Sequence, residues 1–491
     1  MSKDMLSVAK DLCAAFGRGE GLKQAALRGG TLLGIASVSE QTFRIARSLL
    51  LTRLLAPEAF GIMAIVYATS YVVDMLADIG VGDAIVQNPK GNERSYVNSA
   101  WWLSFCRGVV IYAILFVASP WVGRFYGHIE IEPLMRLALL SIVFAGARSP
   151  GAYVALKEMR FKQWAIIQNG AGVAGSVVVV ILACFIQSVW ALAFGYVAEH
   201  FIRCIVSYVV CPFLPTLEFD NNALRHLLRF SRGVFGLSFL YLIFSRTDIF
   251  VLGKLFSATE LGVYTMAVYL VQVPMSFIVG VIRQTLMPSI ARIQDDRVRI
   301  NRILYRATSA VVLFGMPGLI FLVLSSRSLL SLVYGDRYGS GSLALTIAAL
   351  VAFVNVTNNL ITVVFFATGN PGFHRRCVII MAVLMLGLIY PSVKLFGLAG
   401  GQIAALVAVT GGYISQIARI RHLMSLDLSK YIRSSSFVIG VSFVVLALAL
   451  GIREFLTASG PIANLALGGS GCALALYICG RSLMRRPAAD A

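Results

Sequence analysis

The chain shows its building pattern in residues 29–87, which read GGTLLGIASVSEQTFRIARSLLLTRLLAPEAFGIMAIVYATSYVVDMLADIGVGDAIVQ. This sequence holds two largely apolar segments, at 30–52 and 59–81, with a short break between them. An α-helix of about 20 residues is long enough to cross the hydrocarbon core of a bilayer, which is about 30 Å thick. Each segment is therefore predicted to form a membrane-spanning helix.

Similar segments recur along the rest of the 491 residues, and we count about fourteen of them; twelve or thirteen remain open because some breaks, such as that at Ser188, are short. Residues of the AVILMFWYC set make up 58% of the chain and DEKR residues only 13%. A typical globular protein is about 45–50% apolar and about 25% charged. The composition excludes a secreted domain, a disordered regulator and a cytosolic enzyme, and it predicts an all-α polytopic membrane protein.

The basic residues indicate how the chain is oriented. The net charge is +19, and most Lys and Arg residues lie between the apolar segments. With an even number of spans, one side carries roughly four times as many Lys and Arg residues as the other, and positively charged loops stay on the cytoplasmic side. Both termini are therefore predicted to be cytoplasmic, and the positive charge needs no nucleic-acid partner.

An internal repeat divides the spans into two halves. Residues 51–68, LTRLLAPEAFGIMAIVYA, resemble residues 252–269, LGKLFSATELGVYTMAVY. At an offset of 201 residues, the alignment pairs Arg53 with Lys254, Leu54 with Leu255, and Gly61 with Gly262. Parallel repeats of this kind predict two six-helix lobes related by an axis along the membrane normal.

The repeat predicts five regions. They are a cytoplasmic amphipathic N-terminus at 1–29, an N-lobe at 30–211, a cytoplasmic connecting loop at 212–230, a C-lobe at 231–418, and two further spans with a cytoplasmic tail at 419–491. The connecting loop lies near the middle of the chain, and we expect it to act as a hinge.

Charged residues inside the spans are the candidate functional residues. Each costs at least about 2.5–3.5 kcal/mol at the bilayer centre on insertion scales, so such residues usually face a cavity or one another. Glu40, Arg44 and Arg47 share one helical face, because they are spaced i, i+4, i+7. The basic candidates for substrate binding are Arg44, Arg47, Arg107, Arg148 and Arg246, and the acidic candidates for ion coupling are Glu40, Asp74, Asp78 and Asp248.

Two interpretations of these charges remain open. Clustered arginines in a cavity suit phosphate or diphosphate, which a guanidinium group binds in a bidentate manner. Alternatively the charges pair structurally: Glu40 with Arg44, Asp74 or Asp78 with Arg107, and Arg246 with an acid of the neighbouring lobe. Arg148 precedes Pro150, which is expected to break its helix.

Two weaker polar signals favour structural roles. Asn355, Thr357, Asn358 and Asn359 could line a path for sugar hydroxyls, but hydrogen bonds to neighbouring helices are favoured. His200, next to Glu199, could relay protons, but a structural role is favoured for it too.

The sequence shows no catalytic motif. It has no GxSxG, Walker A or HExxH pattern, and its eight cysteines form no CxxC pair. We therefore expect no enzyme activity, no metal and no cofactor. Energy for transport would come from an H⁺ or Na⁺ gradient, the membrane potential or substrate consumption.

The opening segment resembles a known family. The motifs LxRLLxPEAFGxxA (Leu51 to Ala64) and DxGxGDAIVQ (Asp78 to Gln87), together with LGVYTMAVYLVQVP and GNPG further on, are similar to the polysaccharide-transport branch of the multidrug/oligosaccharidyl-lipid/polysaccharide (MOP) exporter superfamily. The resemblance covers essentially the whole chain, and the colanic acid exporter subgroup is the most similar.

The resemblance implies both an architecture and a function. It implies two six-helix lobes around a central cavity, plus two C-terminal helices, in the bacterial inner membrane. The cargo would be an undecaprenyl-diphosphate-linked oligosaccharide flipped outward for exopolysaccharide or O-antigen biosynthesis, with its prenyl tail in membrane lipid and a polysaccharide polymerase and chain-length regulator as further partners. Arg44, Arg47, Arg107 and Arg148 would engage the diphosphate.

There are three alternative functions, of which the first is also transport and the other two belong to other classes. A cation-coupled multidrug exporter of the same superfamily would need an acidic cavity, whereas the predicted cavity is basic. A membrane glycosyltransferase or polymerase would need a large external loop or an acidic metal-binding motif, and the sequence shows neither. A scaffold for a polysaccharide-assembly complex would not transport.

Overall fold

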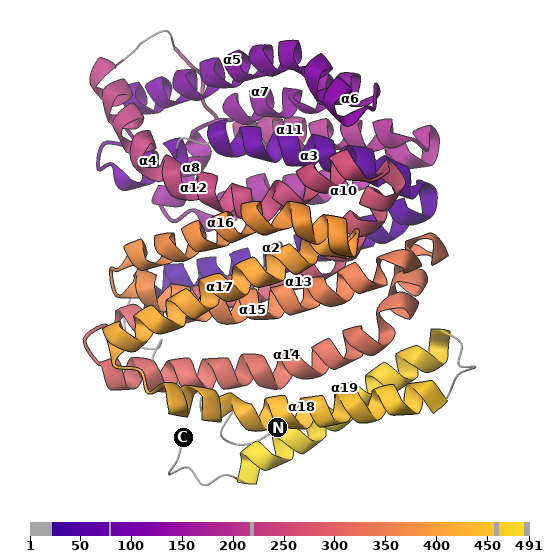
Figure 1. The fold of residues 1–491 in the computed structure, drawn as a ribbon. Coiled ribbons are helices and arrows are strands. Elements are labelled where there is room, and N and C mark those ends of the chain that lie inside the picture. Colours follow the sequence, from indigo (N-terminus) through magenta and orange to yellow (C-terminus); the bar gives the residue numbers. More distant parts are fainter. Residues whose placement is uncertain (1–21, 78–79, 217–219, 456–460, 486–491) are drawn as a thin grey trace. The chain divides into compact units, whose positions relative to one another are not determined.

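The computed structural model describes residues 22–77, 80–216, 220–455 and 461–485, and within these ranges all regular secondary structure is helical (Figure 1). The elements are α2 (Leu22–Leu54), α3 (Pro57–Ala77), α4 (Val81–Gln87), α5 (Arg94–Tyr126), α6 (Ile131–Ala138), α7 (Leu140–Gly146), α8 (Gly151–Lys157), α9 (Phe161–Ala165), the π-helix η1 (Ile166–Gly170), α10 (Ala171–Ile186), α11 (Val189–Val210), α12 (Asn221–Leu255), α13 (Ala258–Ala291), α14 (Arg297–Tyr334), the 3₁₀-helix η2 (Asp336–Gly341), α15 (Ser342–Ala367), α16 (Pro371–Phe396), α17 (Ala399–Met424), α18 (Leu428–Phe455) and α19 (Pro461–Arg485). The predicted all-α class is confirmed. The predicted amphipathic N-terminus lies mostly outside the described residues.

Ten helical segments of the described chain are long and apolar enough to cross a membrane, and the bent pair α6–α7 and α8 would make eleven. The predicted number of fourteen is therefore not confirmed. α2 and α12 are 33 and 35 residues long, but their charged residues lower their hydropathy. The apolar part of α19, Asn464–Cys479, is shorter than a full span. If these three helices also cross the bilayer, the total is the predicted one.

Two predicted breaks lie where the sequence placed them. The helix axis bends by 54° between Gly146 and Gly151, where Pro150 interrupts the fourth predicted span. α10 ends at Ile186 and α11 begins at Val189, so the short break around Ser188 does separate two helices. The first break follows from the proline, which lacks the N–H group that a helix interior requires. At the second break, Gln187 adopts the left-handed conformation that commonly ends a helix.

The chain forms two compact units. Unit 1 comprises residues up to Leu50, Val73–Arg124 and His128–Phe235, and unit 2 comprises Leu51–Val72, Phe125–Gly127 and the rest from Gly236. Most of α3 thus groups with the second half of the chain. The lobe boundaries proposed from the sequence stay predictions.

The predicted hinge segment is bonded to α5 in unit 1. Asn98 donates to the carbonyl of Thr216 at 2.7 Å and accepts from the Thr216 N–H at 2.8 Å. The indole N–H of Trp102 donates to the same carbonyl at 2.7 Å, and the Asp220 N–H donates to the Ser99 hydroxyl at 3.0 Å. These bonds make the described part of 212–230 an element of unit 1 rather than a free linker, and α12 itself runs on into unit 2.

The repeat is visible as a contact between α3 and α13 in unit 2. A Cβ atom on Gly61 would lie 1.7 Å from the carbonyl oxygen of Ala258, and a Cβ on Gly262 would lie 1.8 Å from that of Pro57. Pro57 and Ala258 are separated by the same 201 residues as the two glycines. Each glycine therefore packs against the first turn of the other helix, as a two-fold arrangement requires.

Two cations extend this symmetry. Arg53 donates to the carbonyl of Leu332, in the last turn of α14, at 2.8 Å. Its repeat counterpart Lys254 donates to the carbonyl of Phe125, in the last turn of α5. Carbonyl groups at a helix C-terminus have no partner within the helix, and a cation there is favourable. Each half thus caps the third predicted span of the other half. We call Arg53, Gly61, Lys254 and Gly262 the outer clasp.

The last two helices pack on α14 within unit 2 (Figure 1, yellow). Val445 and Ala449 of α18 and Ala475 of α19 form one apolar cluster with Ile320 and Leu324 of α14. The predicted C-terminal pair is therefore attached to the second half of the chain.

Candidate functional site

The face of α2 that carries Glu40, Arg44 and Arg47 is the starting point of the site. Arg44 donates to Glu40 Oε1 through Nε at 3.0 Å and through Nη2 at 2.8 Å. The predicted pairing of Glu40 with Arg44 is thus confirmed. It orients the guanidinium group, because two of its donors are held by one carboxylate oxygen.

Glu199 of α11 joins this face to a second helix. Its Oε1 accepts from Arg44 Nη2 at 3.1 Å and from Arg203 Nη2 at 2.9 Å, and its Oε2 lies 3.9 Å from Arg47 Nη1. The Glu199 side chain is only 8% exposed. One buried carboxylate therefore holds three arginines.

Two glycines of α10 let the carboxylates approach its backbone. A Cβ on Gly172 would lie 2.5 Å from Glu40 Oε1, and a Cβ on Gly175 would lie 2.6 Å from the Cβ of Glu199. The spacing i, i+3 puts both glycines on one face of α10. Larger residues there would push either carboxylate away.

Arg148 supplies a fourth cation at the break between α7 and α8. Its Nε is buried and has no hydrogen-bond partner among the described residues. Its charge acts on His200, Arg203 and Cys204 of α11. We call Glu40, Arg44, Arg47, Arg148, Glu199 and Arg203 the arginine cluster; four guanidinium groups and two carboxylates give it a formal charge of +2.

Part of this cluster was missed by sequence reasoning. Glu199 was considered only as the neighbour of His200, and Arg203 was not considered. Their i, i+4 spacing within one helix was the available signal. His200 itself is buried, and its Nδ1 lies 3.0 Å from the carbonyl of Tyr196, one turn earlier. This contact agrees with the structural role favoured for it.

The other candidates of the first half lie on α5 and α3. Arg107 is on α5, and Asp74 is on the part of α3 that belongs to unit 1. The pairing predicted between them stays a prediction. Asp78 lies outside the described residues.

Arg246 and Asp248 both lie on α12, in unit 2. The guanidinium carbon of Arg246 lies 4.5 Å from the ring centroid of Tyr71, so its contact is a cation–π interaction in place of the predicted acid. Asp248 is buried and accepts from the Tyr264 hydroxyl at 2.6 Å and from the Ile249 N–H at 2.9 Å. Gln402 donates to the same hydroxyl at 2.7 Å. Asp248 is therefore part of a hydrogen-bonded network that connects three helices.

The polar residues of α15 bond within their own helix or to a neighbouring helix: Asn359 donates to the carbonyl of Asn355 at 2.9 Å. Thr357 and Asn358 are buried, and Asn358 contacts the Cys377 thiol of α16 at 3.8 Å. Gln416 of α17 donates to the Thr362 hydroxyl at 3.1 Å. These contacts between helices agree with the structural interpretation favoured from the sequence. Within the described ranges, no three His, Cys, Asp or Glu residues are arranged to hold a metal ion.

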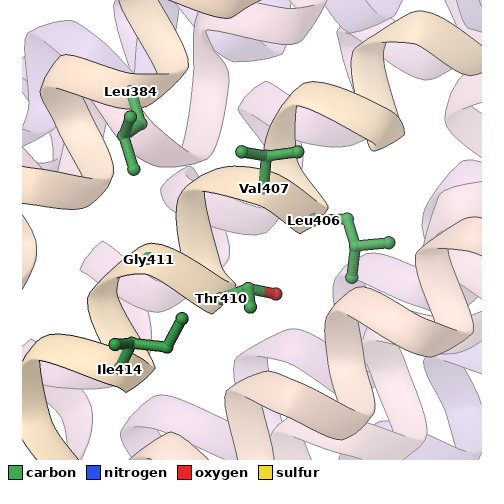
Figure 2. Close-up of a pocket in the computed structure, with 6 residues that line it drawn as sticks. All are labelled: Leu384, Leu406, Val407, Thr410, Gly411 and Ile414. Atoms are coloured by element: carbon green, nitrogen blue, oxygen red, sulfur yellow. The ribbon is translucent and has the colours of Figure 1, made fainter.

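A groove on α16 and α17 shows the opposite chemistry to the arginine cluster (Figure 2). Its volume is about 300 Å³, and Thr410 provides the one side-chain oxygen among its lining residues, Leu384, Leu406, Val407, Thr410, Gly411 and Ile414. An uncharged wall of this kind cannot stabilise a phosphate, whereas it suits the hydrocarbon chains of lipid.

Fold and site define the class: an all-helical, multi-pass membrane protein with charged groups buried between its helices. Residues 50–342, more than half of the chain, match the family described as "Polysaccharide biosynthesis protein". The chain therefore belongs to this family. The resemblance to a polysaccharide-transport family that the sequence motifs indicated is confirmed.

Known proteins similar to the chain extend over most of its length. The lipopolysaccharide biosynthesis protein WzxC of Escherichia coli (strain K12) is 22% identical over 444 residues, which cover 88% of each chain. The succinoglycan biosynthesis transport protein ExoT of Rhizobium meliloti (strain 1021) is 22% identical over 289 residues, covering 59% of this chain and 58% of that protein. The solved structure of the lipid II flippase MurJ in its inward closed conformation matches with a TM-score of 0.74 and 13% identity, covering 93% of this chain and 100% of that one. This last similarity shows a shared fold.

Proposed function

We propose that the chain flips undecaprenyl-diphosphate-linked oligosaccharide repeat units across the bacterial inner membrane, for exopolysaccharide or O-antigen biosynthesis. The similar proteins are named for lipopolysaccharide biosynthesis, succinoglycan transport and lipid II flipping. In this proposal both termini are cytoplasmic, and a polysaccharide polymerase and a chain-length regulator act on the flipped product.

The arginine cluster is the single observation that carries the proposal. Guanidinium groups bind phosphate oxygens through paired N–H donors, and they are less strongly hydrated than ammonium groups, so they suit a buried site. Arg44, Arg47, Arg148 and Arg203 would therefore replace the water around the diphosphate, while the prenyl chain remains in lipid. Arg107 and Arg246 stay as additional candidates for contacts with the cargo.

The charge of the cluster also weighs against a multidrug exporter. A cationic drug would be repelled by a site with a formal charge of +2, whereas an anion is attracted. Coupling to H⁺ or Na⁺ remains part of the proposal, with Glu40, Asp74, Asp78 and Asp248 as the candidate groups.

Flipping in proteoliposomes tests the proposal. The full chain is reconstituted with a fluorescent polyprenyl-diphosphate oligosaccharide, and outward movement is followed by quenching. We expect Arg203→Gln to slow flipping about ten- to hundredfold, because a hydrogen bond to a charged group contributes about 1.5–3 kcal/mol.

The matched control is Arg160→Gln. Arg160 pairs with Glu158 in unit 1, but both side chains are about half exposed, so this variant should flip at the unmodified rate. Equal rates for Arg203→Gln and the unmodified chain would refute the proposed site. If the unmodified chain does not flip the lipid while a scramblase in control liposomes does, the proposed function is refuted.

A further inference from the structure

The carboxylate of Glu199 is surrounded by guanidinium groups. Its two oxygens face three guanidinium groups, with Arg203 at 2.9 Å, Arg44 at 3.1 Å and Arg47 at 3.9 Å. Arginines that surround an oxyanion in this way are the usual arrangement of a phosphate site. Here the oxyanion belongs to the chain itself.

We propose that Glu199 is a positioning residue that acts as an internal counter-ion: it holds the arginines between cargoes, and the diphosphate replaces it as their acceptor during binding. This inference rests on the proposed function and adds to it how the site is kept ready and how its charge is balanced.

The remaining contacts explain how the arginines stay in place during the exchange. Arg44 keeps two hydrogen bonds to Glu40, and Arg203 donates to the carbonyl of Gln168 at 3.3 Å as well as to Glu199. These two arginines therefore have a second acceptor when Glu199 is displaced. Such preorganisation reduces the cost of ordering side chains on binding.

The backbone of α10 limits where Glu199 can move. Its Cβ lies against Gly175, at a position that leaves no room for even one added methyl group. The base of the Glu199 side chain is therefore fixed beside α10, and the carboxylate stays within reach of the site. It can therefore take the arginines back when the diphosphate leaves, which promotes release of a tightly held anion.

Glu199 also adjusts the charge of the site. The cluster has a formal charge of +2, and a diphosphate that links a prenyl chain to a sugar carries two negative charges. The complex is then neutral, which matters because an uncompensated buried charge is costly. A prenyl monophosphate sugar carries one charge and would leave the site unbalanced. Glu199 thus brings the charge of the site to the value that a diphosphate balances.

The test separates binding from turnover. The full chain and the variants Glu199→Gln, Glu199→Asp and Glu158→Gln are purified in detergent for binding and reconstituted for flipping. The probes are a farnesyl-diphosphate disaccharide and its monophosphate analogue, with undecaprenyl forms used in liposomes. Glu158→Gln is the matched control, because it removes the same charge from an exposed ion pair of the same unit.

We expect Glu199→Gln to bind the diphosphate probe about fivefold more tightly and to flip it about tenfold more slowly, because the competing carboxylate no longer helps release. Its preference for the diphosphate over the monophosphate should be at least as large as that of the unmodified chain, because the remaining charge of +3 is further from balance with one negative charge than with two. Glu199→Asp, which keeps the charge, should restore most of the flipping rate, and Glu158→Gln should match the unmodified chain.

Weaker or unchanged diphosphate binding by Glu199→Gln would overturn the inference. So would a loss of binding and of flipping by the same factor together with a lowered unfolding temperature, because a residue with a purely structural role would show that result. These outcomes leave the proposed function intact if the unmodified chain flips the diphosphate lipid. If the unmodified chain neither binds nor flips it, the proposed function fails first.

Discussion

Gly175 shows how a single hydrogen atom in place of a side chain shapes the site. It allows Glu199 to pack against the backbone of α10 and so to reach arginines from α2 and α11 at the same time. The position of the carboxylate is thus fixed by a residue that carries no functional group.

We expect Gly175→Ala to slow flipping about tenfold or more, because the new methyl group would lie 2.6 Å from the Cβ of Glu199 and small displacements of positioning groups are costly. The control is Gly170→Ala, where the added Cβ would meet only Ile166, at 3.9 Å. The measurement is the flipping rate of each variant in liposomes. Equal rates for the two would show that the position of Glu199 is not critical.

The residues of the site were only partly predictable. The Glu40–Arg44 pair was predictable, because its i, i+4 spacing within one helix can be read directly from the sequence. The contact of Arg44 with Glu199 joins residues 155 positions apart, and no local rule indicates that separation. Arg246 was expected to find an acid and instead lies over Tyr71, since an aromatic ring can also stabilise a buried cation.

At the level of helices, α3 and α13 approach each other closely. It depends on Gly61 and Gly262, which face the carbonyl oxygens of Ala258 and Pro57. The capping box of α13 fixes its start: the Ser257 hydroxyl accepts from the Glu260 N–H, and the Glu260 carboxylate accepts from the Ser257 N–H. The first turn is therefore ordered where the glycine contact occurs.

We expect Gly61→Ala to destabilise the protein by about 1–3 kcal/mol, the usual cost of overpacking, because the new Cβ would lie 1.7 Å from a carbonyl oxygen. Gly280→Ala, on α13 itself, is the control; nothing lies within 4 Å of its added Cβ, so its stability should be unchanged or higher. Thermal unfolding in detergent measures both. A Gly61→Ala variant as stable as the control would contradict the contact.

The helices themselves were predictable from hydropathy to different degrees. The apolar helices from α13 to α18 were clear, because lipid requires long apolar segments. α2 and α12 are less apolar, since Glu40, Arg44 and Arg47 lie on one and Arg246 and Asp248 on the other. Charged residues within a helix lower its mean hydropathy, so hydropathy alone identifies these two helices less clearly as membrane spans.

At the level of the whole molecule, the path of the chain through the membrane depends on α2, α12 and α19. α2 and α12 are long enough to cross but are less apolar, whereas the apolar part of α19 that the structure describes is shorter than a full span. The loop charges predict that all three cross, because leaving out any one of them would move every later part of the chain to the opposite side of the membrane.

Cysteine labelling tests this prediction for α12. In a chain without its native cysteines, Asn222→Cys and Thr259→Cys flank the helix at exposed positions. We expect an impermeant maleimide added to intact spheroplasts to label Thr259→Cys only, and disrupted membranes to be labelled at both positions. Labelling of both or neither in intact spheroplasts would mean that α12 does not cross.

The outer clasp has a consequence for the origin of the molecule. Arg53 caps α14 and Lys254 caps α5, so neither half satisfies its own third span. A polypeptide of half this length could complete those caps only by associating with a second copy, each subunit donating its cation in trans, as an isologous dimer does. Within this one polypeptide, the two halves of the repeat make the reciprocal contacts that such a homodimer would make between subunits.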